Sequence, residues 1–353
     1  MNKIEASFWH KDDSGKIVCD ICPRHCSLQN GQKGYCFVRG CENDKICLHA
    51  YGRASSFCID PIEKKPLNHF LPGTPVLSFG TIGCNLGCKF CQNWTISESE
   101  EMNELSEEGM PEEIANAAVK YGCRSVAFTY NEPVIFFEYA RDVAKACHQK
   151  KIKTVAVTAG YIEKGAREEF FSFIDAANVD LKSFSEDFYR KYCSASLKPV
   201  LETLKYIREK TEVWLEITSL IIPGLNDSPK EIDALTHWIV NELGPQTPLH
   251  LSAFHPSHLM MEVPPTPLTT LIGAREIALK NGLRYVYVGN VSDEKGESTW
   301  CHACGKKLIA RQGYVIDEWN LVNGRCRFCQ TEVAGVYEQK PGKWGDKRLP
   351  IHI

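Results

Sequence analysis

The sequence lacks the long apolar runs and the blocks of like charge that mark membrane proteins and nucleic-acid-binding proteins. No stretch of the 353 residues reaches 18 consecutive apolar residues, and the first thirteen residues hold no continuous apolar segment. We therefore expect a cytoplasmic protein with neither an export signal nor a membrane span. The formal net charge is -3 and no Lys/Arg block is present, so the charge pattern favours neither a nucleic-acid partner nor a membrane partner.

Cysteine, in contrast, is abundant. The chain contains 17 cysteines, an odd number, and most of them stand in clusters with short spacings. In a reducing compartment, clustered cysteines indicate metal ligation more often than disulfide bonds. The cysteine clusters are therefore the first candidates for functional sites.

The central cluster comprises Cys84, Cys88 and Cys91, which are separated by three and then two residues. Gly83 and Gly87 permit the turns that a loop needs to wrap around a metal centre. A structural zinc ion takes four protein ligands, whereas three thiolates on a four-iron cluster leave one iron open to an outside ligand. We interpret the loop as an iron-sulfur site with an open iron. The alternatives are three buried cysteines or half of a zinc site.

This loop, with Phe90 before the third cysteine, resembles the cluster loop of radical S-adenosylmethionine (SAM) enzymes. The resemblance implies that a [4Fe-4S] cluster binds SAM and that an electron from the cluster cleaves it to methionine and a 5′-deoxyadenosyl radical. Residues 60–66, 69–73 and 84–94 together resemble the radical enzyme of the AmmeMemoRadiSam system and, more distantly, pyruvate formate-lyase activating enzymes. This wider resemblance implies partner proteins of that system and a reducing protein as electron donor.

Downstream of the N-terminal segment, short apolar runs alternate with stretches of helical periodicity, which predicts a parallel sheet with helical crossovers. The predicted strands are 76–79, 125–129, 154–158, 178–181, 213–218, 249–252 and 284–288. About 210 residues fall short of the roughly 250 of a full eight-fold barrel, so we expect an α/β fold with a partial (β/α)6-type barrel. The expected domains are a Cys-rich extension (1–72), the radical SAM barrel (73–290) and a C-terminal four-Cys ribbon (291–353).

Sites in parallel α/β barrels lie at the carboxyl ends of the strands. Glu132 follows the second predicted strand, where its carboxylate can bind the ammonium group of SAM. Residues 130–133 occupy the place of the family's Gly-Gly-Glu-Pro element, with Tyr130 and Asn131 replacing the two glycines. The alternative is a helix start capped by Asn131.

Four further residues at strand ends are candidates for cofactor binding. Thr158 ends the third strand, and a plain turn is the alternative there. Asp180 and Lys182 stand two residues apart on a strand and therefore point the same way, into a site or into an interior ion pair. His255 follows the sixth strand and resembles a cofactor-contacting histidine of the activating enzymes; a structural histidine is the alternative.

Two other cysteine groups have the spacing of metal ligands. Cys301, Cys304, Cys326 and Cys329 form two knuckles separated by 21 residues, close to a zinc-ribbon spacing. We expect zinc there, with another iron-sulfur cluster or unligated thiols as alternatives. The N-terminal group is Cys19, Cys22, Cys26 and Cys36, for which an auxiliary [4Fe-4S] cluster, a structural zinc ion and unligated thiols all remain open.

Together with these patterns, the family resemblance implies an enzyme that cleaves SAM and abstracts hydrogen from a partner protein or a partner-bound substrate. A glycyl-radical activase is the alternative within the same chemistry, because the activating enzymes resemble the chain as well. A zinc-rich interaction scaffold is the alternative from a different class, because the same cysteines can bind zinc alone.

Overall fold

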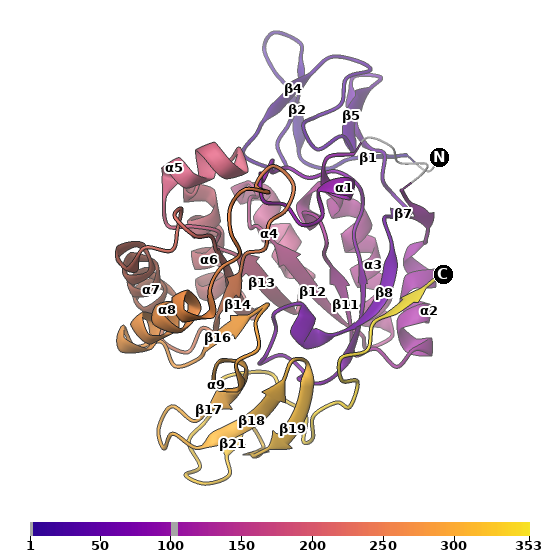
Figure 1. Cartoon of the computed structure of the whole chain (residues 1–353). Helices are drawn as coiled ribbons and strands as arrows, with labels where there is room; N and C mark the ends of the chain where they lie inside the picture. The colour runs from indigo at the N-terminus through magenta and orange to yellow at the C-terminus, as the bar shows by residue number, and fades with distance from the viewer. Residues whose placement is uncertain (1–2, 100–104) are drawn as a thin grey trace.

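The computed structural model describes residues 3–99 and 105–353, and a nine-stranded sheet runs through its centre (Figure 1). Seven neighbouring strands of the sheet are parallel and follow one another in chain order. These strands are β9 (Pro75–Phe79), β11 (Ser125–Phe128), β12 (Lys153–Thr158), β13 (Ala176–Asp180), β14 (Trp214–Ile221), β15 (Leu249–Ala253) and β16 (Val286–Gly289). Beyond β9 the sheet continues with two antiparallel strands, β8 (Phe57–Pro61) and β22 (Leu349–Ile351).

The seven predicted strands are all present, which confirms the expected α/β fold with a parallel sheet. Strands covered by helices are buried on both faces and therefore read as continuous apolar runs rather than as alternating ones. Strand β11 is an example, because all four of its residues are buried. Within the described part of the chain the end strands β16 and β22 do not pair with each other, so the sheet is open.

Helices connect the parallel strands. They are α1 (Trp94–Ser97), α2 (Pro111–Lys120), η2 (Pro133–Phe136), α3 (Phe137–Gln149), α4 (Lys164–Ser172), α5 (Glu186–Phe188), η3 (Tyr189–Cys193), α6 (Lys198–Lys210), α7 (Pro229–Leu243) and α8 (Leu268–Lys280). Helix α7 shows how the local sequence determines where a helix begins and ends. Ser228 accepts a hydrogen bond from the backbone N–H of Glu231, Pro229 takes the first helical position, and Gly244 ends the helix with a φ of 95°.

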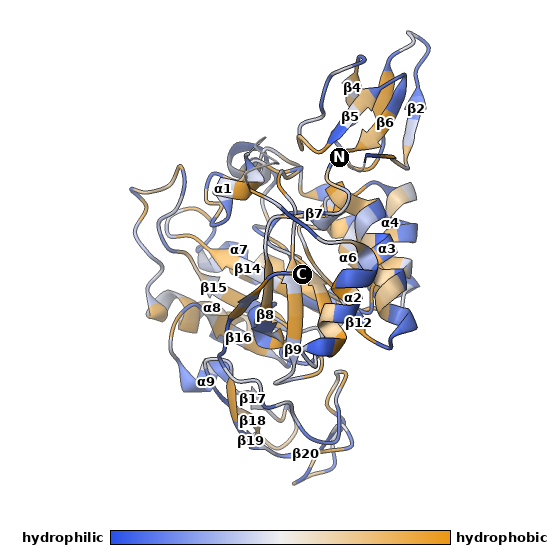
Figure 2. Cartoon of the chain, turned by 90° about the vertical axis from the view of Figure 1, so that its right-hand side faces the viewer, coloured by the Kyte–Doolittle hydropathy of each residue, from blue (hydrophilic) through white to orange (hydrophobic). Residues whose placement is uncertain are grey.

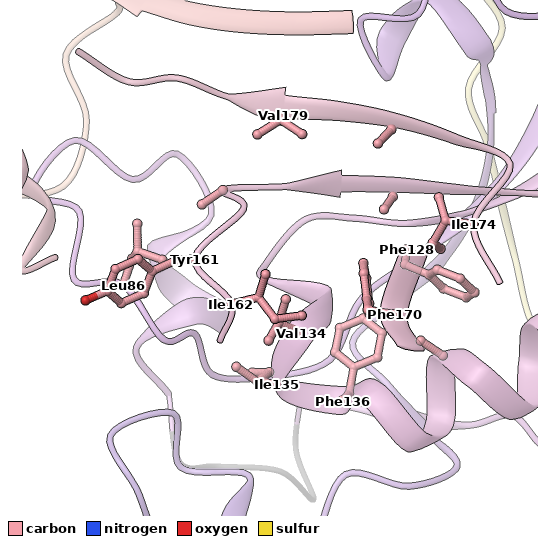
Figure 3. Packing of buried hydrophobic residues seen from close by; sticks show 14 of the residues in the cluster. Leu86, Phe128, Val134, Ile135, Phe136, Tyr161, Ile162, Phe170, Ile174 and Val179 are labelled. Carbon is pink, nitrogen blue, oxygen red and sulfur yellow. The ribbon is translucent and has the colours of Figure 1, made fainter. Parts of the chain in front are cut away.

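The apolar faces of the helices pack onto the sheet and form one large core. Figure 3 shows Phe128 of β11 and Val179 of β13 among the side chains of this core, together with Phe136 and Phe170 from η2 and α4. The same core includes Leu86, which belongs to the predicted cluster loop. Figure 2 shows the resulting pattern from the side, with β9 in the orange of hydrophobic residues and both colours on α2. The side chain of Leu86 therefore anchors the loop in the hydrophobic core.

The N-terminal segment folds into small antiparallel sheets at one end of the central sheet, at the top of Figure 1. Its strands are β1 (Ile4–Glu5), β2 (Trp9–Lys11), β3 (Ile17–Cys19), β4 (Cys26–Leu28), β5 (Arg39–Glu42), β6 (Lys45–Leu48) and β7 (Arg53–Ala54), with β7 paired to β10 (Glu107–Glu108). A buried ion pair ties this segment to α3. The two terminal nitrogens of Arg39 donate to the two carboxylate oxygens of Glu138 at 2.9 and 3.0 Å.

The C-terminal segment forms a small β-module at the opposite end of the sheet, at the bottom of Figure 1. It comprises α9 (Glu294–Glu297), β17 (Thr299–Trp300), β18 (Lys307–Gln312), β19 (Val315–Trp319), β20 (Leu321–Val322) and β21 (Arg325–Cys326). Tyr285, which precedes β16, and Tyr287 of β16 share a core with Leu308 and Ile309 of this module. A terminal nitrogen of Arg311 donates to the carbonyl of Asn68 in the loop after η1 (Ile62–Lys64). The module is thus packed against the sheet.

None of the helices in the described ranges is long and apolar enough to cross a membrane.

The contribution of the Arg39–Glu138 ion pair to the stability of the protein can be tested by mutation. Glu138→Ala leaves a fully buried guanidinium without its counter-charge, which we expect to lower the free energy of unfolding by about 3–5 kcal/mol. Urea denaturation followed by circular dichroism measures the change. Asp187→Ala removes one partner of an exposed pair and serves as the control, with little expected effect. Equal stability of the two variants would contradict the assignment.

Candidate functional site

The carboxyl ends of the parallel strands open onto one cavity of about 530 Å³. The lining of this cavity brings together eight of the nine residues that the sequence predicts for the cluster and its cofactor: Cys84, Cys88, Cys91, Asn131, Glu132, Thr158, Asp180 and Lys182. They come from the last residues of β12 and β13 and from the segments that follow β9, β11 and β13, because parallel strands end at the same edge of a sheet. The cavity is therefore the candidate active site.

The three cysteines sit on a loop whose backbone is tied down along its length. Gly83 donates its N–H to the carbonyl of Ile96 at 2.8 Å, and the N–H of Cys91 donates to the carbonyl of Cys88 at 3.0 Å. Gly83 has a φ of 79°, and a Cβ at this position would lie 1.9 Å from the carbonyl oxygen of Cys36. Only glycine permits this turn and this close approach.

A fourth thiol, that of Cys193 at the end of η3, lies against the loop. It lies close to the thiol of Cys88. The carbonyls of Tyr192 and Cys193 accept hydrogen bonds from the N–H groups of Lys89 and Gly87, at 2.9 and 3.0 Å. No local pattern predicts this contact, because Cys193 stands outside every cysteine cluster of the sequence and reaches the loop only through the fold.

Glu132 lies almost fully buried at the end of β11. Its carboxylate accepts hydrogen bonds from the Thr158 hydroxyl at 2.5 Å, from the N–H of Ala159 at 2.7 Å and from the N–H of Val134 at 3.3 Å. Burial raises the pKa of Glu132 to about 7. Thr158 is thus a direct hydrogen-bond partner of Glu132, and its hydroxyl orients the carboxylate that the sequence analysis predicts to bind SAM.

Asn131 holds the beginning of the cluster loop. Its side-chain nitrogen donates to the carbonyl of Gly83 at 2.8 Å and to the Thr81 hydroxyl at 3.1 Å, and its side-chain oxygen accepts from the N–H of Thr81 at 3.2 Å. The possibility that Asn131 caps the following helix is wrong, because the side chain of Glu132 occupies the cap of η2. Asn131 instead links the end of β11 to the loop after β9.

Asp180 and Lys182 point to the same side, as their spacing predicts, and form an ion pair with an Nζ to Oδ2 distance of 2.8 Å. Burial alone would lower the pKa of Lys182, but Asp180 and the nearby thiols outweigh it and raise that pKa well above its ordinary value. Lys182 therefore stays charged at the wall of the cavity. His255, in contrast, is exposed, bonds the carbonyl of Asn290 at 3.3 Å and does not line the cavity.

The cavity wall also contains cationic and aromatic residues that sequence reasoning missed: Lys64, Lys65, Tyr314 and Arg348. Lys64 and Lys65 donate to the buried carboxylate of Asp60 at 3.1 and 2.8 Å. All three belong to segment 60–66, which contributed to the family resemblance but carried no residue role. Tyr314 and Arg348 come from the last 40 residues of the chain, and only the fold brings them to the cavity.

The four C-terminal cysteines form a compact group away from this cavity. The Sγ atoms of Cys301 and Cys329 are 3.6 Å apart, those of Cys304 and Cys326 are 3.8 Å apart, and all four lie within 4.8 Å of one another. Four thiolates around one zinc ion at 2.3 Å would stand about 3.8 Å apart. The group therefore has the size of a single-ion site and fits a ribbon module.

The N-terminal cysteines also come together. Cys19, Cys22, Cys26 and Cys36 line a small enclosed cavity on the far side of the cluster loop, together with Asn85 from the loop itself. In the described part of the chain they do not form a group as tight as the C-terminal one. Their geometry thus differs from that of a single-ion site.

Comparisons with known proteins agree with this geometry. The model of the radical SAM superfamily matches residues 79–238. The chain belongs to the radical SAM superfamily. An uncharacterised protein of Methanocaldococcus jannaschii is 42% identical over 331 residues, which cover 93% of this chain and 98% of that protein.

More distant relatives of this radical SAM protein include activating enzymes. The pyruvate formate-lyase-activating enzyme of Clostridium pasteurianum is 28% identical over 169 residues, covering 45% of this chain and 67% of the enzyme. Among solved structures, a domain of the pyruvate-formate lyase-activating enzyme from Bacteroides vulgatus is 20% identical, covers 47% of this chain and 99% of that domain, and has a TM-score of 0.42.

Membership of the superfamily makes the protein an enzyme and implies a [4Fe-4S] cluster and SAM. The residues at the cavity fit both groups. Three thiols from one loop line the cavity without a fourth cysteine in that loop, and the buried carboxylate of Glu132 lines the same cavity. A three-thiol donor set suits a cluster with one open iron better than it suits a closed zinc site.

The compact C-terminal group predicts one tightly bound metal ion. We expect Cys326→Ala to lose that ion, because three ligands hold a structural ion much more weakly than four. Metal analysis of the purified variant measures the loss. Cys147→Ala, which changes a buried thiol outside every cysteine cluster, is the control and should retain all bound metal. Full metal content in Cys326→Ala would show that the group is not a metal site.

Proposed function

We propose that Cys84, Cys88 and Cys91 hold a [4Fe-4S] cluster and that the adjoining cavity binds SAM. One observation supports this proposal: the three thiols and Glu132 line the same cavity of about 530 Å³ at the carboxyl ends of the strands. When bound, the cluster and SAM supply the reductive cleavage that yields a 5′-deoxyadenosyl radical, which abstracts hydrogen from a substrate. The protein's own residues bind and orient these groups.

Glu132 has the main role in this orientation. A buried carboxylate attracts an ammonium group strongly, since little water competes with it. Thr158 and Ala159 hold the carboxylate in place, and Asn131 keeps the cluster loop at a fixed distance from it. These contacts favour a site that is built before SAM binds.

Asp180 and Lys182 supply one negative and one positive group at the wall of the same cavity. In this proposal they receive the polar parts of SAM as a pair, so the cavity gains binding groups without a net charge. His255 remains a predicted cofactor residue outside the cavity lining, and a movement of its loop would have to bring it to SAM.

The architecture proposed around this site is a partial barrel of the (β/α)6 type. The open sheet with parallel strands in chain order supports it. The proposed divisions are residues 1–72 for the Cys-rich extension, 73–290 for the barrel and 291–353 for the C-terminal ribbon, where we propose zinc. The N-terminal cysteines are proposed as a third metal site, for an auxiliary [4Fe-4S] cluster or zinc.

For the substrate, we propose a partner protein or a molecule bound to a partner, as in an AmmeMemoRadiSam system. The similarity to activating enzymes supports a macromolecular substrate, and an open sheet leaves room for a large one. The alternative function is activation of a glycyl-radical enzyme. A zinc-rich scaffold explains the compact C-terminal group but not the arrangement of Glu132 at a three-thiol loop.

The cluster assignment predicts that Cys84→Ala abolishes 5′-deoxyadenosine formation, because a cluster with an incomplete ligand set loses stability and its reduction potential. Anaerobically purified protein is given SAM and dithionite, and the product is measured by chromatography. Cys123→Ala changes a buried thiol outside the clusters and should keep wild-type activity. Unchanged product formation by Cys84→Ala, or none by the wild type, would refute the proposed function.

The raised pKa of Glu132 predicts a pH dependence of SAM binding. As the pH falls through about 7, Glu132 takes up a proton and loses the charge that attracts the ammonium group, so affinity should fall. Calorimetric titration with SAM between about pH 6 and 8 measures this in the wild type. Glu132→Gln should bind SAM more weakly and with no such dependence. A similar pH profile in both proteins would exclude Glu132 from this role.

The two substrate hypotheses predict different products on the partner. An activating enzyme leaves a lasting backbone radical, visible by electron paramagnetic resonance. A modifying enzyme leaves a permanent mass change and no lasting radical. In either case deuterium from the labelled partner should appear in 5′-deoxyadenosine, and full-rate turnover of a free metabolite without any partner would contradict both.

A further inference from the structure

The N-terminal four-cysteine cavity lies directly behind the Cys84–Cys91 loop. We infer that this cavity, lined by Cys19, Cys22, Cys26 and Cys36, holds an iron-sulfur cluster that relays single electrons from a redox protein to the loop. This inference rests on the proposed function, because the relay needs an electron acceptor at the loop.

The arrangement of the thiols favours a cluster over a single ion. All four line one enclosed cavity, three of them buried and Cys26 half-buried. They do not form an ion-sized group, whereas the C-terminal four do. A four-iron cluster is larger than one zinc ion and holds its four cysteines further apart. One chain thus contains two four-cysteine sites of different size.

Hydrogen-bond donors surround the thiols. The backbone N–H of Arg24 lies near the sulfur of Cys22, and those of Val38 and Arg39 lie near the sulfur of Cys36. N–H groups close to a sulfur stabilise its negative charge and tune cluster potentials.

Arg39 supplies a further, unused donor. Its side chain is 1% exposed and lines the cavity, and its Nε has no hydrogen-bond partner among the described residues. An unpaired buried donor is costly unless a ligand meets it. A cluster with its negatively charged sulfurs is a ligand of the required chemistry.

Contacts between the cavity and the loop are direct. The Nε of Arg24 donates to the carbonyl of Asn85, the residue after Cys84, and Asn85 itself lines the cavity. The carbonyl of Cys36 lies so close to Gly83 that a Cβ there would be 1.9 Å away. A protein ligand of one site is therefore in van der Waals contact with the loop that carries the other.

The two sites also line different cavities. Tyr35, the neighbour of Cys36, is 42% exposed, so the N-terminal cavity lies just beneath the surface. The loop thiols face the larger cavity, which SAM and substrate would fill. An electron donor can then approach from the N-terminal side while the substrate stays in place. Each transfer moves one electron from the reduced donor protein to the N-terminal cluster and then to the loop, with no atom or proton exchanged.

The first test asks which metal the N-terminal cavity holds. A triple variant, Cys84→Ala with Cys88→Ala and Cys91→Ala, removes the loop site and leaves the N-terminal one. We expect this protein to retain bound iron and to give the paramagnetic resonance signal of an iron-sulfur cluster after reduction. Additional Cys22→Ala should abolish that signal, and Cys47→Ala should not. A triple variant that contains zinc but no iron would overturn the inference.

The second test separates the relay from the chemistry. Wild type, Cys22→Ala and the control Cys47→Ala are compared in SAM cleavage with dithionite and with reduced flavodoxin as the protein donor. Dithionite is small and reaches the loop cluster directly, so Cys22→Ala should keep its activity with dithionite and lose it with flavodoxin. Equal loss with both reductants would indicate a structural role, and equal retention would exclude a relay. Failure of the wild type with dithionite would instead refute the proposed function.

Discussion

The structure depends on one constraint, which is that three thiols on a loop of eight residues must face the same cavity. A free loop that follows one glycine, Gly83, and contains another, Gly87, would lose much conformational entropy on adopting that arrangement. Three groups of contacts hold the loop in this arrangement and offset the lost entropy. Asn131 bonds the beginning of the loop, the carbonyls of η3 accept from its middle, and the N-terminal segment packs behind Gly83. The loop is therefore part of the core.

This constraint explains why the two terminal segments do not fold as separate appendages. The N-terminal segment supplies Arg24 and the Arg39–Glu138 pair, which fix it between the loop and α3. The C-terminal module packs at the other end of the sheet, yet Tyr314 and Arg348 reach the cavity from it and from the tail that follows. Segments from both ends of the chain thus help to form the site, although the predicted cluster ligands come from the central part of the chain.

The elements that could be predicted from the sequence are those determined by neighbouring residues in the chain. The parallel strands follow from apolar runs, the cysteine groups from their spacing, and the pairing of Asp180 with Lys182 from the two-residue period of a strand. Sequence reasoning could not reach Cys193, Tyr314 or Arg348, because each is brought to the site by tertiary packing over a long sequence separation. It also assigned the helix cap to Asn131 as an alternative, whereas the buried carboxylate of Glu132 fills that position and frees Asn131 to bond the loop.

The most direct test of the account is whether SAM binds at the iron of the Cys84–Cys91 loop. The reduced protein is frozen with and without SAM, and its electron paramagnetic resonance spectrum is recorded. We predict a cluster signal that changes its g values when SAM is added and that is absent from Cys84→Ala. A signal that SAM leaves unchanged, or a protein without any iron-sulfur signal, would contradict the central claim.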